Sequence, residues 1–142
     1  MSSSESITEE AAQQLDNYLS TFNAGDFGGV AKFYDEPFVS ISRAGVSVIR
    51  DHKAAEDLLV STVERLKKDG FSNSVWAAPK KVIVLDEAGL VLVSCPCRRL
   101  RQDGTLCEQF TATYTMRKTD DQRWLIVAIH THPFTNQLNQ ES

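Results

Sequence analysis

The chain has 142 residues, of which 42% are hydrophobic and 24% are charged, and its formal net charge at pH 7 is −4. This length and composition favour one globular domain with one core. The acidic balance excludes the basic surface on which nucleic acids and anionic membranes bind, and no apolar run is long enough to span a bilayer.

The N-terminal residues and the number of cysteines indicate in which cellular compartment the protein is expected. Residues 1–10 lack the basic and apolar regions of a signal peptide. Three cysteines are too few for a disulfide framework. We therefore expect a cytoplasmic protein with reduced thiols.

The first helix is predicted from a capping box and an apolar stripe. Ser6 and Glu9 have the spacing of a capping box, in which each side chain binds the other's backbone N–H at the start of a helix. We expect residues 1–7 to be flexible. Gly25 is placed to end the helix, because glycine readily takes the left-handed conformation after a last helical turn. The stripe at helical spacing consists of Ala11, Leu15, Tyr18, Leu19 and Phe22.

Two further helices enclose two short strands. Asp26 can cap a short helix that runs to Tyr34, and Asp51 can cap a third helix. Between them, residues 38–42 and 46–49 have the composition of two short strands. The apolar stripe of the third helix consists of Ala55, Leu58, Leu59, Val63 and Leu66.

The second half of the chain has the pattern of strands. Four long strands are predicted over residues 74–86, 90–101, 105–118 and 123–132. Helices gathered before a run of antiparallel strands indicate an α+β domain, in which the helices lie on one face of a curved sheet. We expect this single domain to cover residues 8–134, followed by a flexible polar tail over residues 135–142.

The two central strands form a hairpin whose register follows from its turn. Asp103-Gly104 is typical of two-residue hairpin turns, in which glycine supplies a positive φ. One face is then apolar and must be covered by the helices, whereas the other carries Thr111 and Thr113. Pro96 inside the strand predicts a bulge. The predicted cross-strand pairs are Gln102 with Thr105, Arg99 with Glu108, Cys97 with Phe110, Cys95 with Ala112, and Val93 with Tyr114.

Several short motifs carry a family resemblance. They are FNAGDF, FYDEP, LKKDG, RRLRQDG, TATYTMRKTDDQRWLI and the terminal histidine pair. In this order they resemble the nuclear transport factor 2-like superfamily, which includes SnoaL-like and ketosteroid isomerase-like proteins. The resemblance covers residues 8–134. It implies a cone, in which a bent sheet wraps around three N-terminal helices with a pocket between them, and often a homodimer through the outer sheet face.

Three side chains on the apolar face of the hairpin are candidates for catalysis. Tyr114 is either a core tyrosine with a local hydrogen bond or a donor in the pocket wall, as in ketosteroid isomerase, where a tyrosine helps to hold an oxyanion. Arg99 and Glu108 form either a salt bridge at the rim or an arginine that Glu108 orients toward a carbonyl or carboxylate. The expected pocket lining is Tyr18, Phe22, Phe33, Tyr34, Trp76, Cys97 and Phe110.

His130 is a fourth catalytic candidate, as a general acid or base, and a rim or interface histidine is the alternative. It shares a strand face with His132, but no third ligand follows nearby, so we expect no metal. A four-residue turn at 119–122 directs Leu125 and Ile129 inward and the histidines outward. A turn of odd length reverses this.

The resemblance leaves the activity open. Ketosteroid isomerase-like enzymes place a carboxylate base on the first short strand, where this chain has FVSIS over residues 38–42. Limonene epoxide hydrolase-like members use an Asp-Arg-Asp arrangement, where this chain has arginines without interleaved aspartates. No phosphate-binding or dinucleotide motif is present, so we expect no cofactor.

Two functional hypotheses follow. The first is a cofactor-independent isomerase, polyketide cyclase or dehydratase of secondary metabolism that acts on a small hydrophobic molecule by proton transfer. The second is a non-catalytic ligand-binding or dimerisation module. In either case we expect a homodimer that packs the outer sheet face. The expected contact residues are Gln109, Thr111 and Thr113, with Trp124 or Ile126 nearby.

Overall fold

The computed structural model of the chain describes the backbone of residues 3–138 and the side chains of residues 6–138. The predicted flexible ends, 1–7 and 135–142, therefore lie partly outside the described residues. Within the described part, no helix is both long and apolar enough to cross a membrane.

Three helices precede most of the sheet, as predicted: α1 (Ser3–Asn23), α2 (Phe27–Ala31) and α3 (His52–Lys67). The capping box at Ser6 is wrong, because α1 begins earlier and the Ser6 hydroxyl donates to Glu10 within the helix at 3.2 Å. The predicted caps of α2 and α3 are confirmed. Asp26 accepts from the backbone N–H of Gly29 at 3.0 Å, and Asp51 accepts from that of Ala54 at 2.9 Å.

Seven strands form one curved, open sheet. They are β1 (Tyr34–Ser42), β2 (Gly45–Ile49), β3 (Phe71–Trp76), β4 (Lys81–Asp86), β5 (Leu90–Arg101), β6 (Leu106–Lys118) and β7 (Trp124–His132). Their order is β2-β1-β7-β6-β5-β3, with β4 also paired to β5. The pair β1–β7 is parallel and the other pairs are antiparallel. The second predicted helix ends before Tyr34, because that residue already pairs with Ile126 in the sheet.

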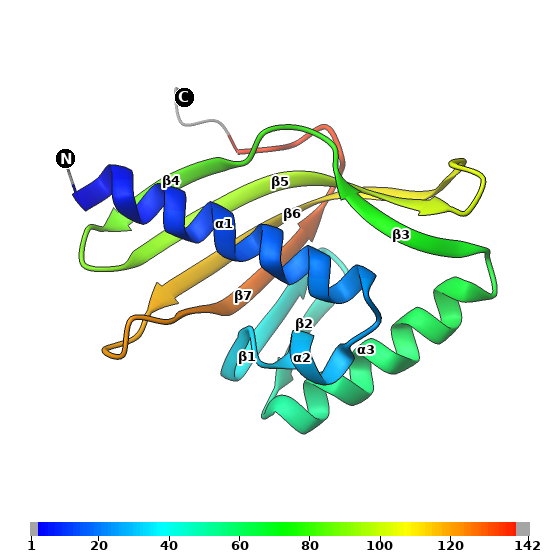
Figure 1. Ribbon diagram of the computed structural model, residues 1–142, viewed down its shortest axis with the longest axis horizontal. Helices are drawn as coiled ribbons and strands as arrows, with labels where there is room; N and C mark the ends of the chain where they lie inside the picture. Colours follow the sequence, from blue (N-terminus) through cyan, green and yellow to red (C-terminus); the bar gives the residue numbers. More distant parts are fainter. Residues whose placement is uncertain (1–2, 139–142) are drawn as a thin grey trace.

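The core lies between the helices and the inner face of the sheet, which confirms the predicted α+β class. In Figure 1, α1 crosses in front of β5 and β6, and α2 and α3 lie below its C-terminal half, with α2 next to β1 and β2. Large apolar side chains that are fully buried in this core are Leu15, Val30, Val91, Val93, Met116 and Ile126.

The long strand predicted over residues 74–86 is wrong, because it is broken into β3 and β4 opposite Pro96. The Pro96 carbonyl accepts from the N–H of Ala77 at 2.8 Å. In an antiparallel strand, the N–H and the C=O of one residue point to the same neighbouring strand. Proline has no N–H, so Pro96 cannot donate a hydrogen bond on the side where β3 ends and β4 begins. On its other side Pro96 pairs with Thr111 with no shift of register, so the apolar face stays continuous past Cys95.

The β5–β6 register is confirmed except at the turn. Gln102 does not pair with Thr105, because the turn holds three residues rather than two. The N–H of Arg101 donates to the Thr105 carbonyl at 2.8 Å, and Gly104 has a φ of 87°. A bulge at Cys107 then restores the predicted register, so that Arg99 faces Glu108.

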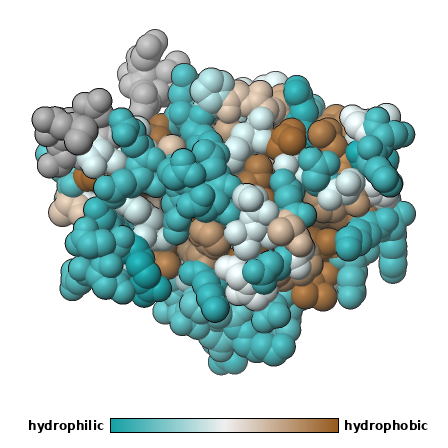
Figure 2. Space-filling view, in the orientation of Figure 1, coloured by the Kyte–Doolittle hydropathy of each residue, from teal (hydrophilic) through white to brown (hydrophobic). Residues whose placement is uncertain are grey.

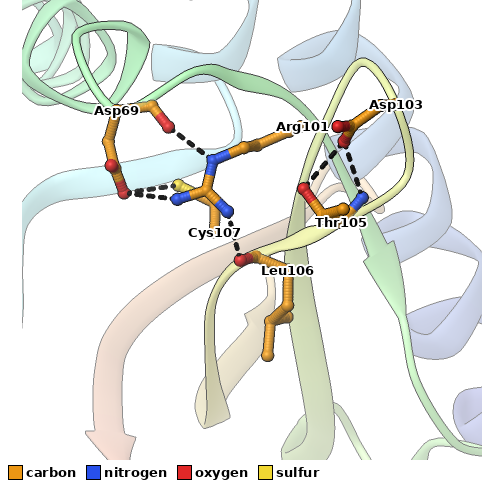
Figure 3. A network of polar contacts seen from close by, with 6 residues as sticks. All are labelled: Asp69, Arg101, Asp103, Thr105, Leu106 and Cys107. Carbon is orange, nitrogen blue, oxygen red and sulfur yellow. Dashed lines mark hydrogen bonds and ion pairs between the residues drawn. The ribbon is translucent and has the colours of Figure 1, made fainter.

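The guanidinium of Arg101 ties the β5–β6 hairpin to the end of α3 (Figure 3). Its Nε donates to the Asp69 carbonyl at 2.8 Å, and its Nη2 lies 3.1 Å from an Asp69 carboxylate oxygen. Its Nη1 donates to the Leu106 carbonyl at 2.5 Å. At the other end of α3, His52 contacts the Tyr34 carbonyl through Nε2 at 2.9 Å. Both ends of α3 are therefore attached to the sheet.

The turn before β7 has an odd length, and a bulge compensates for it. Thr119 donates to the Arg123 carbonyl at 2.8 Å, so three residues form the turn. The β6–β7 register then shifts between Thr115 and Met116. As a result, Leu125 lies on the outer face, as expected for an odd turn, whereas the bulge returns Ile129 to the inner face.

The C-terminal segment covers the middle of the outer sheet face. The Thr111 hydroxyl donates to the Phe134 carbonyl at 2.8 Å, and the N–H of Leu138 donates to the Ser94 hydroxyl at 3.1 Å. Ser94 and Thr111 are fully buried under this segment. The described part of the predicted tail, residues 135–138, thus packs against the sheet.

This arrangement corrects the predicted dimer contact. Thr111 and Thr113 are buried beneath the chain's own C-terminal segment. Trp124 and Ile126 lie on the inner face, where the Trp124 indole donates to Glu10 of α1 at 2.9 Å. Of the predicted contact residues, Gln109 is the one that is exposed.

Candidate functional site

A cavity of about 330 Å³ lies between α1, α3 and the inner face of the sheet. Hydrophobic side chains reach the surface between α1 and α3 in the space-filling view (Figure 2). The volume is at the low end for pockets that hold organic ligands. The lining residues are Tyr18, Phe22, Tyr34, Ser40, Leu58, Leu59, Thr62, Arg99, Glu108, Gln109, Phe110, Ala112, Tyr114, Ile129 and Thr131.

A smaller recess of about 40 Å³ adjoins this cavity, and we call it the inner recess. It shares part of its wall with the main cavity, including Arg99 and Tyr114. Ser74, Trp76 and Cys97, from β3 and β5, line the inner recess but not the main cavity. A space of this size holds a single small polar group.

All three tyrosines of the chain meet at the cavity. The hydroxyls of Tyr18 and Tyr34 are hydrogen-bonded at 2.7 Å, and the Tyr18 and Tyr114 rings make an edge contact with centroids 5.9 Å apart. Burial raises the pKa of all three phenols, well above the usual value for Tyr34 and Tyr114. They therefore stay protonated at neutral pH and can donate hydrogen bonds.

Arg99 and Glu108 place an ion pair in the cavity wall. The Arg99 Nη1 donates to a Glu108 carboxylate oxygen, and the guanidinium carbon lies 4.7 Å from the centroid of the Phe110 ring. The Arg99 side chain is 20% exposed, whereas that of Glu108 is 42% exposed. The pair is thus a nearly neutral polar spot, with its carboxylate on the solvent side.

The structure brings most of the predicted site residues together. Tyr114, Arg99 and Glu108 line one cavity, with Tyr18, Phe22, Tyr34 and Phe110 of the predicted lining around them. Trp76 and Cys97 line the inner recess. Phe33 does not line either space, because its ring packs edge-on against Tyr18 with centroids 5.8 Å apart.

His130 is not part of this site. It lies on the outer sheet face, where its Nδ1 contacts the Thr113 carbonyl at 3.4 Å. His132 lies beside it, with Nε2 2.6 Å from the Thr113 hydroxyl, and burial, followed by the nearby His130, lowers its pKa. The catalytic role predicted for His130 in the cone pocket is therefore wrong. In the described part of the chain, no three His, Cys, Asp or Glu side chains form a group that could hold a metal ion.

Sequence reasoning missed the residues that α3 and β1 bring to the cavity. Leu58, Leu59 and Thr62 lie at its α3 side, and Leu58, which belongs to the apolar stripe of that helix, is 47% exposed. Ser40 lines the cavity from β1. Ser40 belongs to the FVSIS strand, so its position could have been found from the resemblance.

The polar groups at the cavity are suited to binding an oxygen atom of a ligand, and they include no activated nucleophile. Burial raises the pKa of the Cys97 thiol to about 11, so it is not a thiolate at neutral pH. The phenols and the guanidinium are donors, whereas Glu108 is the carboxylate among the cavity-lining residues. A bound oxygen can therefore be stabilised by these donors, and Glu108 supplies a carboxylate at the same cavity.

We expect Tyr18→Phe to lower the free energy of unfolding by about 1–3 kcal/mol, because it leaves the buried Tyr34 hydroxyl without its partner. The double substitution Tyr18→Phe and Tyr34→Phe should recover most of this loss, since both partners are then apolar. Urea unfolding of the wild-type protein and of these two variants measures the effect. A loss in the double variant as large as that of Tyr18→Phe, or larger, would show that the two hydroxyls do not stabilise each other.

The chain matches the model of a protein family described as NTF2-like protein (DUF6841) over residues 9–134. No curated protein sequence matches it. A solved NTF2-like protein with a cystatin-like fold from Novosphingobium aromaticivorans has 18% identity and a TM-score of 0.72, over 92% of this chain and 84% of its own.

Two further solved structures are similar to the chain. One, from Catenulispora acidiphila in complex with S-DNPA, has 16% identity and a TM-score of 0.69, over 89% of this chain and 94% of its own. The other, an NTF2-like superfamily protein from Salmonella enterica, has 17% identity and a TM-score of 0.67, over 98% of this chain and 99% of its own. At these identities the likeness establishes the fold alone.

Proposed function

Because the chain belongs to the NTF2-like family DUF6841, we propose that its cone cavity binds a small, mainly apolar molecule that carries one oxygen function. The observation that carries this proposal is a cluster of neutral phenols and one compensated ion pair in an otherwise apolar wall. Such walls bury a ring body and orient it by a few polar groups. The volume of about 330 Å³ suits a molecule of one or two rings.

The structural comparisons support ligand binding within this fold. The similar protein from Catenulispora acidiphila was solved in complex with S-DNPA. The present chain adds its own polar groups, since Tyr18, Tyr34, Tyr114 and Arg99 all reach the cavity.

Two-ring probes test the proposal directly. Isothermal titration with naphthalene and 2-acetylnaphthalene should show saturable binding of one molecule per chain, and either probe should raise the thermal midpoint. Absence of saturable binding of both probes would contradict the proposed function.

Proton-transfer catalysis is the second candidate function, as an isomerase, cyclase or dehydratase, and Glu108 favours it. Its carboxylate lies at the same cavity as the phenol donors, so a base and oxyanion donors face one bound molecule. Enolisation requires both elements together. Ser40 occupies the strand on which related isomerases carry their carboxylate, so Glu108 would take over the role of the base.

The substitution Glu108→Gln separates the two functions. It keeps the side-chain shape and one acceptor for Arg99 but removes the base. We expect affinity for 2-acetylnaphthalene to stay within about threefold, whereas base-catalysed exchange of its methyl protons for deuterium, followed by NMR, should fall by about 10²-fold or more. Equal exchange in both proteins, or none above buffer, would exclude catalysis by Glu108 and leave a binding module.

A further inference from the structure

Two residues that line the inner recess each carry a buried side-chain N–H group without a hydrogen-bond partner. Among the side chains that the structure describes, Trp76 Nε1 and Arg99 Nε are the buried nitrogen or oxygen atoms without one. Both residues line the inner recess. An unpaired buried donor is costly, so the presence of two at one small space indicates that an acceptor belongs there.

The surrounding contacts hold both groups in place. Arg99 stacks on Phe110 and binds Glu108 through Nη1, so its Nε takes no part in the ion pair. The Trp76 ring makes an edge contact with Tyr114 at 6.2 Å, and Lys80 Nζ lies 5.5 Å from its centroid. The other indole of the chain behaves differently, because Trp124 donates to Glu10 at 2.9 Å.

The charge of the site selects the kind of acceptor. Glu108 compensates the charge of Arg99, so the inner recess presents donors without a net positive charge. A neutral carbonyl oxygen matches two such donors, whereas a carboxylate would add an uncompensated charge in a buried space. The volume of about 40 Å³ leaves room for this one group and not for a ring.

We propose that the inner recess is a carbonyl subsite, in which Trp76 Nε1 and Arg99 Nε bind the oxygen of a neutral ketone, aldehyde or amide. This inference rests on the proposed function, because the apolar body of the same molecule fills the main cavity. Both nitrogens are shielded from solvent in the structure, so binding includes a small side-chain adjustment that brings them to the oxygen. The subsite therefore selects ligands with a carbonyl group at one end and does not restrict the structure of the apolar ring body.

Three matched probes test the subsite: naphthalene, 2-acetylnaphthalene and 2-naphthoate. The wild-type protein should bind the ketone about tenfold more tightly than the hydrocarbon, and the carboxylate no more tightly than the ketone. In Trp76→Phe, which keeps an aromatic ring but removes the N–H, the advantage of the ketone over naphthalene should fall to about twofold, because the ketone alone loses a hydrogen bond. Ketone binding should also shift the indole fluorescence of a Trp124→Phe protein, whose remaining tryptophan is Trp76.

The controls distinguish failure of the subsite from failure of the cavity. Trp124→Phe should leave the ketone advantage intact, and Arg99→Lys, which keeps a cation opposite Glu108 without the ε N–H, should reduce it. An unchanged ketone advantage in Trp76→Phe, or tightest binding of the carboxylate, would overturn the carbonyl subsite while the cavity stands. Absence of binding of all three probes would overturn the proposed function, and the subsite with it.

Discussion

Replacement of Leu15 by alanine should lower the free energy of unfolding by about 2–5 kcal/mol, the range measured when a fully buried leucine is truncated. Leu15 lies in the middle of α1 and is 0% exposed. Alanine is the best helix former, so the substitution does not harm the helix itself. The loss therefore reports the packing of α1 on the sheet, measured by urea unfolding at constant pH.

Leu58→Ala is the matched control. Leu58 is also a helical leucine, in α3, but it is 47% exposed at the cavity. We expect its loss to stay below about 1 kcal/mol, as for most surface substitutions. Similar losses for Leu15 and Leu58 would mean that α1 does not pack on the inner face of the sheet as described.

Ala112→Leu should abolish most ligand binding. Ala112 lies on β6 at the cavity, opposite Cys95 in the hairpin. The leucine side chain adds three carbon atoms to the cavity. Displacing three buried ligand carbons costs about 2.4 kcal/mol, at about 0.8 kcal/mol each, which is a loss of roughly 60-fold in affinity. Titration with 2-acetylnaphthalene measures this loss.

The stability of the same variant tests whether the cavity is open. Filling an open apolar cavity leaves the free energy of unfolding unchanged or raises it by about 0.5–2 kcal/mol. Ala128→Leu is the control, because Ala128 pairs with Thr115 on the outer face of the sheet. It should leave probe affinity unchanged. Severe destabilisation by Ala112→Leu would instead identify a filled core at this position.

The hairpin shows how far the sequence alone reaches. The pairing of Arg99 with Glu108 and of Val93 with Tyr114 follows from one dipeptide and from strand alternation. The error at Gln102 did not propagate, because the extra turn residue and the bulge at Cys107 cancel. The main part of the candidate site could be predicted for this reason.

Strand β7 shows where such reasoning fails. The odd turn and the later bulge each exchange the inner and outer faces of the strand. Neither can be predicted from the residue types at these positions, since Gln122, which has a positive φ in the turn, is not a typical turn residue. Trp124 and Ile126 therefore lie inward, whereas His130 lies outward. Contacts between distant segments are also beyond local patterns. The packing of Phe134 and Leu138 on the outer face depends on buried hydroxyls of the sheet.

The attachment of α3 at both ends has a consequence for ligand exchange. Arg101 holds its C-terminal end to the hairpin, and His52 holds its N-terminal end to β1. The middle of the helix, with Leu58 and Thr62, spans the cavity between these two anchors. A molecule leaving the cavity must therefore pass between side chains rather than under a swinging helix. For the ligand that we propose, the rate of exit should then depend on side-chain rotations at mid-span, with both anchors in place.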